Sequence, residues 1–177
     1  MPILIAFGGL PGTGKTTLAR AVAQEMDAAY LRIDTIEQAL RASGLASGDM
    51  GPAGYLIAYA LAENNLRLGL NVVADSVNPI ALTRDAWRRV AAEASAQLIE
   101  IEIACSDREE HRRRIETRKL DVPGVVPPTW REVVEREYEP WDRPHIVIET
   151  ARRSIADTLA ELISLIGYLV RGCSSAE

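Results

Sequence analysis

The feature that most constrains this chain is a glycine-rich loop near its start. Residues 9–16 read Gly-Leu-Pro-Gly-Thr-Gly-Lys-Thr and match the pattern G-x-x-x-x-G-K-[ST]. The loop follows a short apolar run at residues 3–7, which is typical of a buried strand. It precedes residues 15–26, whose apolar side chains recur at helical spacing. A strand, a glycine loop and a helix in this order are the context in which the pattern binds phosphate.

The residue types in the loop predict contacts with a nucleotide. Glycines let successive backbone N–H groups point inward, and the helix N-terminus adds partial positive charge, so a phosphate chain is held mainly by main-chain donors. Lys15 is expected to reach the β- and γ-phosphates, and the Thr16 hydroxyl to bind Mg²⁺. We therefore expect ATP and Mg²⁺ as cofactors. The predicted nucleotide-binding residues are Gly9, Pro11, Gly12, Thr13, Gly14, Lys15, Thr16 and Thr17.

The rest of the chain alternates between strand and helix patterns. Further strands are predicted at residues 30–33, 70–75, 97–104 and 145–149. Helical periodicity or capping residues mark residues 36–43, 55–68, 79–94, 107–119, 129–138 and 154–170. Alternating strands and helices predict an α/β fold with a parallel sheet and helices on both of its faces. A length of 177 residues fits a single domain spanning residues 1–177.

Two aspartates come at the ends of predicted strands. In open parallel sheets the ligand crevice lies beyond the carboxyl ends of the strands, where the glycine loop also lies. Asp75 ends an apolar run and is predicted to hold a magnesium-bound water, with a helix or turn cap as the alternative. Asp34 is predicted to orient an acceptor hydroxyl and take its proton. The alternative for Asp34 is an N-cap for a helix that starts at Thr35.

With the loop, Asp34 and Asp75, the chain resembles the P-loop kinases, which include gluconate kinase, shikimate kinase, chloramphenicol phosphotransferase and the kinase domain of polynucleotide kinase. The resemblance covers nearly the whole chain. It implies a three-layer P-loop NTPase fold whose five-stranded parallel sheet has the order 2-3-1-4-5, with a small helical lid at about residues 107–143. It also implies that Asp34 acts on the acceptor hydroxyl and that Asp75 helps to position magnesium.

The lid of these kinases carries arginines four residues apart, and Arg114 and Arg118 have that spacing. The resemblance implies that they act catalytically, because a lid arginine can stabilise charge on the transferring phosphoryl group. The alternative is a solvated charged helix in which Glu109, Glu110 and Glu116 pair with neighbouring arginines. The family also places the adenine between the lid helix and the loop after the fifth strand, here residues 148–153.

The chain departs from the better-known members of the family at residues 121–143. Trp130, Tyr138 and Trp141 are interleaved there with prolines. These aromatic side chains could line a substrate pocket, or they could anchor the lid against the body of the protein. Both interpretations stay open at this point.

The function predicted from these features is transfer of the γ-phosphate of ATP to a hydroxyl of a small-molecule acceptor. One alternative is a 5'-hydroxyl polynucleotide kinase, but a net charge of -5 disfavours a nucleic-acid partner. Another alternative is an ATP-binding switch protein that is not a kinase. A GTP-dependent switch is disfavoured because the guanine-recognition pattern N-K-x-D is missing.

Cysteine usage and hydropathy indicate the compartment. Cys105 and Cys173 are far apart and have no metal-ligand spacing, which argues against both a disulfide framework and a zinc site. The apolar stretches are shorter than the roughly 20 residues that a membrane-spanning helix needs. We therefore expect a cytoplasmic protein without a membrane partner. The sequence names neither the acceptor nor an oligomeric state.

Overall fold

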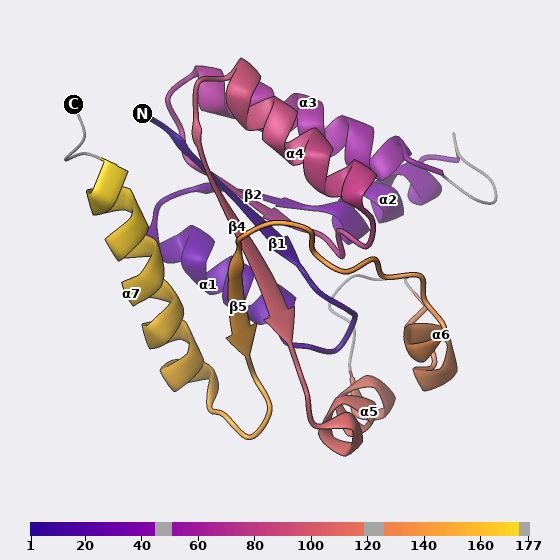
Figure 1. Cartoon of the computed structure of the whole chain (residues 1–177). Coiled ribbons are helices and arrows are strands. Elements are labelled where there is room, and N and C mark those ends of the chain that lie inside the picture. Colours follow the sequence, from indigo (N-terminus) through magenta and orange to yellow (C-terminus); the bar gives the residue numbers. More distant parts are fainter. Residues whose placement is uncertain (45–50, 119–125, 174–177) are drawn as a thin grey trace.

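The computed structural model describes residues 1–44, 51–118 and 126–173. Five parallel strands form one sheet in the spatial order β2-β3-β1-β4-β5 (Figure 1). The strands are β1 (Ile3–Gly8), β2 (Ala29–Arg32), β3 (Val72–Asp75), β4 (Gln97–Ala104) and β5 (Ile146–Glu149). Both the predicted fold class and the predicted strand order are confirmed.

Helices cover both faces of this sheet. They are α1 (Lys15–Glu25), α2 (Ile33–Ala42), α3 (Ala53–Arg67), α4 (Ala81–Glu93), α5 (Arg108–Thr117), α6 (Trp130–Val134) and α7 (Ile155–Cys173). Figure 1 shows α1 and α7 on one face and α3 and α4 on the other. Helices α5 and α6 lie beyond the carboxyl end of β4, so the predicted lid region sits over the edge where β1 delivers the glycine loop. Among the described residues, no helix is long and apolar enough to cross a bilayer.

Strand β1 lies at the centre of the molecule and is buried on both faces. Ile5 and Phe7 pack with α1 and α7 in one core, while Leu4 and Ala6 pack with α3 and α4 in the other. A strand covered on both sides reads as a continuous apolar run, which explains the pattern at residues 3–7. The loop that follows β1 therefore starts from a strand that is buried on both faces.

The end of β2 differs from the prediction. The β2–β3 ladder pairs Arg32 with Asp75, and β3 ends there, so the chain leaves the sheet at Arg32. Asp34 is then the second residue of α2, and the N-cap is Arg32. The expectation that Asp34 closes the second strand is wrong, and so is the alternative that it is the N-cap.

The predicted lid at residues 107–143 contains α5 and α6. Helix α6 begins after Thr129, whose side chain forms a reciprocal capping box with Glu132, as the predicted cap requires. It ends at Val134, earlier than the predicted end near residue 138. Residues 119–125 of the predicted lid lie outside the described residues.

Candidate functional site

The glycine loop has backbone angles that favour glycine. Gly9, Gly12 and Gly14 have φ angles of 130°, 84° and 96°. A Cβ on Gly9 would lie 2.3 Å from the carbonyl oxygen of Ile103 in β4, and one on Gly12 would lie 2.5 Å from the side chain of Ile115 in α5. The loop is thus pressed between β4 and α5, and no larger residue fits at Gly9 without moving backbone.

Side chains from distant segments hold the carbonyl groups of the loop. The Nε2 of His111 in α5 donates to the carbonyl of Pro11 at 2.7 Å. The hydroxyl of Thr150, just after β5, donates to the carbonyl of Thr13 at 2.8 Å. These bonds satisfy backbone carbonyl groups of the loop and tie the loop to α5 and to the segment after β5. Neither brace was predicted, because nothing in the local sequence of His111 or Thr150 marks it.

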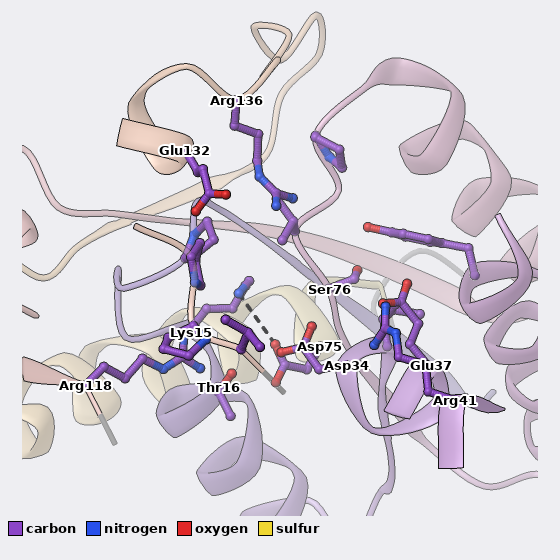
Figure 2. A pocket seen from close by; sticks show the side chains of 18 residues that line it. Lys15, Thr16, Asp34, Glu37, Arg41, Asp75, Ser76, Arg118, Glu132 and Arg136 are labelled. Carbon is purple, nitrogen blue, oxygen red and sulfur yellow. Dashed lines mark hydrogen bonds and ion pairs between the residues drawn. The ribbon is translucent and has the colours of Figure 1, made fainter. Parts of the chain in front are cut away.

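A cleft of about 730 Å³ opens beside the loop, at the carboxyl edge of the sheet (Figure 2). Six residues predicted for the site meet there: Pro11, Lys15, Thr16, Asp34, Asp75 and Arg118. The other lining residues are Ile33, Glu37, Arg41, Tyr55, Ser76, Val77, Pro79, Val126, Pro127, Pro128, Glu132 and Arg136. Thr17 is exposed on α1 and does not line the cleft, so its contact with a nucleotide stays a prediction.

Asp75 is a buried carboxylate between two cations. Its Oδ1 lies 3.7 Å from Nζ of Lys15, and its Oδ2 lies 3.8 Å from Nε of Arg32. The Tyr30 hydroxyl donates to Oδ2 at 2.7 Å, and burial, together with the Asp75 charge, raises the pKa of Tyr30 so that the phenol keeps its proton. These partners offset the cost of burying the charge. Asp75 also lines the cleft, which supports the predicted role at the magnesium site over the alternative role as a helix or turn cap.

Asp34 faces the same cleft from the first turn of α2. Its side chain is 50% exposed, and its Oδ2 accepts a hydrogen bond from Nη2 of Arg32 at 3.2 Å. Arg32 is 4% exposed and contacts both Asp34 and Asp75, so one buried guanidinium links the two predicted acids. The only indication of this interaction in the sequence is that Arg32 stands two residues before Asp34.

The two predicted lid arginines occupy different places. Arg118 lines the cleft near Lys15 and Thr16 (Figure 2). Arg114 instead donates to the hydroxyl and carbonyl of Thr150 at 2.9 and 2.8 Å and forms an ion pair with Glu110 at 2.6 Å. The predicted alternative, pairing along the helix, is therefore observed for Arg114. A catalytic role for either arginine stays a prediction.

The three aromatic residues after residue 128 anchor their segment to the body of the protein. Trp130 packs edge-on against His111 at 5.2 Å between ring centroids. The Tyr138 hydroxyl donates to Glu102 in β4 at 2.8 Å and accepts from the indole of Trp141 at 3.1 Å. All three are described residues, and the cleft lining includes none of them. These contacts support the anchoring interpretation.

The residues that line the side of the cleft away from the glycine loop were not predicted from the sequence. Glu37 and Arg41 of α2 form an ion pair at 3.4 Å, and burial raises the pKa of Glu37. Burial also raises the pKa of Tyr55 in α3 to about 12, and its hydroxyl accepts a hydrogen bond from the amide of Asn78 at 3.1 Å. Arg136 reaches in from the segment after α6. These residues share no local motif, because only the fold brings them together.

Comparison with known proteins places this architecture in a family. A family model described as an AAA domain matches residues 4–137. The chain belongs to this family. A probable adenylyl-sulfate kinase of Aeropyrum pernix is 26% identical over 187 residues, covering 95% of this chain and 94% of that protein. The recognition of a P-loop kinase family from the sequence is thereby confirmed.

Solved structures agree on the fold. The Mycobacterium tuberculosis APS kinase, in complex with AMPPNP and APS, is 21% identical with a TM-score of 0.71 and covers 94% of this chain and 98% of its own. A Sinorhizobium meliloti gluconokinase is 16% identical with a TM-score of 0.60 over 95% and 97%. Chaetomium thermophilum Kti12, in complex with ADP-AlF3, is 22% identical with a TM-score of 0.62 over 92% and 96%. At these identities the likeness shows the kinase-type P-loop fold.

Proposed function

We propose that this chain transfers the γ-phosphate of ATP to a hydroxyl group of a small-molecule acceptor. The observation that supports this most directly is the single cleft in which the end of the glycine loop and Asp34 face one another. Lys15 and Thr16 stand at one wall, and a half-exposed carboxylate stands within the same space. A cleft of this kind can hold a triphosphate and an acceptor together.

Binding of ATP falls to the loop and its neighbours. Loop N–H groups and the N-terminus of α1 bind the phosphates, with Lys15 at the β- and γ-phosphates and Arg118 facing them from the lid. Thr16 and Asp75 offer the oxygen ligands that Mg²⁺ prefers. The described residues contain no group of three or more His, Cys, Asp or Glu that could hold a metal ion, which suits an ion bound largely by phosphate and water. When bound, Mg²⁺ neutralises charge on the phosphates.

Asp34 handles the proton of the acceptor. As the acceptor oxygen forms its bond to the γ-phosphorus, the hydroxyl proton passes to the Asp34 carboxylate. The bond from the γ-phosphorus to the β–γ bridging oxygen breaks, and ADP leaves with the electron pair of that bond. Arg32 holds the Asp34 carboxylate in place through the 3.2 Å hydrogen bond.

The relatives support a small-molecule kinase over the alternatives. The names of the Aeropyrum, Mycobacterium and Sinorhizobium proteins are those of kinases for adenylyl sulfate and gluconate. Kti12, solved in complex with ADP-AlF3, shares the fold without a kinase name, so the second candidate, an ATP-binding switch without an acceptor, is kept as the alternative to test. The acidic net charge of the whole chain disfavours a polynucleotide acceptor.

The test is ATP consumption with Mg²⁺ across sugars, nucleosides, aminoglycosides and 5'-hydroxyl oligonucleotides, with products identified by mass. Asp34→Asn should lower phosphoryl transfer by about 10²- to 10⁴-fold while ATP affinity stays unchanged. Lys15→Ala should weaken ATP binding itself. If no acceptor is phosphorylated and Asp34→Asn hydrolyses ATP as the wild type does, the switch is the better account. A product from oligonucleotides alone, with steep salt dependence, would favour the polynucleotide kinase.

A further inference from the structure

The Asp75 carboxylate is oriented by residues that do not themselves line the cleft. Its side chain is 2% exposed, and its Oδ1 lies on the side of the glycine loop, 3.7 Å from Nζ of Lys15 (Figure 2). Its Oδ2 is turned toward β2, where Tyr30 and Arg32 approach it. The cleft lining includes neither Tyr30 nor Arg32, and both are described residues. The two carboxylate oxygens therefore face different surroundings.

The contact from Tyr30 is the short and directional one. The Tyr30 hydroxyl lies 2.7 Å from Oδ2, whereas the nitrogens of Lys15 and Arg32 lie 3.7 and 3.8 Å from their carboxylate oxygens. A hydroxyl that donates to a carboxylate forms a charge-assisted hydrogen bond, and such a bond depends on alignment. A Coulomb attraction at nearly 4 Å depends on distance and much less on angle. Tyr30 therefore decides which way the carboxylate faces.

The fold holds Tyr30 itself in place. Tyr30 pairs with Val73 in the β2–β3 ladder, two residues before Arg32 pairs with Asp75, so the register of the sheet sets its distance from the acid. Its ring packs against the apolar core between the sheet and α1. A ring fixed by both a strand and a core cannot follow the carboxylate if the latter rotates. The hydroxyl is therefore a stationary donor.

The oxygens on the loop side of the cleft fit a magnesium ion. Thr16 contributes a hydroxyl and Asp75 a carboxylate to the cleft wall. Mg²⁺ prefers oxygen ligands, takes few of them from protein and requires near-octahedral geometry. Such an ion tolerates little misorientation of the groups that bind it or bind its water molecules. With Oδ2 engaged by Tyr30, Oδ1 is the oxygen that Asp75 presents on this side.

We propose that Tyr30 is a positioning residue for magnesium: its hydroxyl holds Oδ2 of Asp75 so that Oδ1 faces the complex of metal and nucleotide. The inference rests on the nucleotide- and magnesium-binding part of the proposed function and does not depend on the acceptor. Loss of a group that orients a metal ligand typically lowers metal affinity about 10- to 100-fold. A tyrosine that only compensates for the burial of Asp75 would affect stability and leave metal binding unchanged.

The experiment measures how much Mg²⁺ tightens the binding of a non-hydrolysable ATP analogue. The dissociation constant is determined by calorimetry once with Mg²⁺ and once with EDTA, and the ratio of the two constants is called the metal effect. The wild type should bind the analogue more tightly with Mg²⁺. Tyr30→Phe keeps the ring and removes the hydroxyl, so it should reduce the metal effect about 10-fold and leave the affinity in EDTA unchanged.

Tyr59→Phe is the matched control. Tyr59 of α3 is also partly buried, its hydroxyl donates to the carbonyl of Thr83 at 3.0 Å, and it does not line the cleft. Both variants should remain folded in thermal unfolding, with Tyr30→Phe the less stable because its lost bond is to a charged group. Tyr59→Phe should keep the wild-type metal effect. Thr16→Ala lacks the hydroxyl expected at the metal and gives the reference for a reduced effect.

Two results for Tyr30→Phe would overturn this inference. A wild-type metal effect would mean that the hydroxyl only compensates for the burial of Asp75. An equal loss of affinity with Mg²⁺ and with EDTA would mean that Tyr30 acts through Lys15 and the phosphates.

The same measurements separate this inference from the proposed function. A wild type that binds the analogue equally well with Mg²⁺ and with EDTA would remove the magnesium role from the proposed function, and this inference with it. If the metal effect is lost in Tyr30→Phe but no acceptor is phosphorylated by the wild type, Tyr30 keeps its role and the kinase proposal fails.

Discussion

The two halves of the cleft are built in different ways. The backbone of the phosphate half comes from one continuous segment, the glycine loop and the start of α1, which packs against β4 and α5. Among the described residues, only Asp75 and Arg118 are added to it from elsewhere in the chain. The side of the cleft away from the loop, where the proposed function places the acceptor and which we call the acceptor half, is lined by side chains from α2, α3, the segment after β3 and the segment around α6. A continuous segment can be recognised as a motif, whereas scattered side chains cannot. This difference explains why the sequence predicted a phosphate-binding site but did not identify the acceptor.

The variant expected to have the largest effect on the phosphate half is Gly9→Ala. The φ angle of 130° alone costs about 1 to 3 kcal/mol for a residue with a Cβ, and the contact at 2.3 Å with the Ile103 carbonyl adds to that cost. We expect a lower free energy of unfolding by chemical denaturation and weaker ATP binding in the same variant.

Gly69→Ala is the matched control for this prediction. Gly69 also has a positive φ, 84°, but no atom lies within 4 Å of the position that its Cβ would take. It should show the backbone cost without the clash, and it should leave ATP affinity unchanged. Equal losses of stability in the two variants would mean that β4 does not confine the loop.

The contrast between continuous segments and scattered side chains also explains which features could be predicted from the sequence. Glycine spacing and strand–helix alternation predicted the loop, the parallel sheet and the strand-closing Asp75, because each depends on neighbouring residues. The strand order was predicted only through the resemblance to the P-loop kinases, since spacing alone does not give it. The position of Asp34 was wrong because the ladder with β3 ends β2 two residues earlier. Pairing between distant strands sets that end, and no local pattern reports it.

In the lid, too, the sequence does not predict which distant residues a single side chain contacts. The sequence predicted one helix that carries both Arg114 and Arg118. Arg114 does lie in α5, but the helix ends at Thr117 and Arg118 follows it in an extended conformation, so the expectation is wrong for Arg118. The four-residue spacing could not show that Thr150, from beyond β5, engages Arg114. Arg136 had no distinguishing neighbours in the sequence at all. Its place in the cleft depends on how the segment after α6 packs on the sheet.

The acceptor half depends on a buried anchor, and Arg84→Met tests it. Arg84 of α4 is 1% exposed and donates to the carbonyls of Asn78, Glu139 and Pro140 at 3.3, 3.2 and 3.1 Å. It thereby ties the segment after β3 to the segment after α6. Its loss leaves buried carbonyls without this donor and should lower the free energy of unfolding by about 1 to 3 kcal/mol. The KM for the acceptor should rise more than the KM for ATP.

Arg88→Met is the control for the anchor, since Arg88 lies one turn further along α4 and is exposed. Arg88→Met should change neither the KM for the acceptor nor the KM for ATP. Arg84→Lys keeps a charge with fewer donors and should fall between Arg84→Met and the wild type. An equal rise of both KM values in Arg84→Met would show that the two halves are not independent.

The smallest expected effect comes from Glu37, whose pKa is raised chiefly by burial. The folded protein holds this proton more tightly than the unfolded chain, so the free energy of unfolding falls as pH rises from 4.5 through the raised pKa. Glu37→Gln keeps the shape that packs on Gly54 and removes the buried charge. The variant should gain stability relative to the wild type near pH 7 and lose that advantage near pH 4, as thermal unfolding across this range can measure. A difference that stays constant with pH would mean that the ion pair with Arg41 fully compensates for the burial of Glu37, so that its pKa is the same in the folded and unfolded chain.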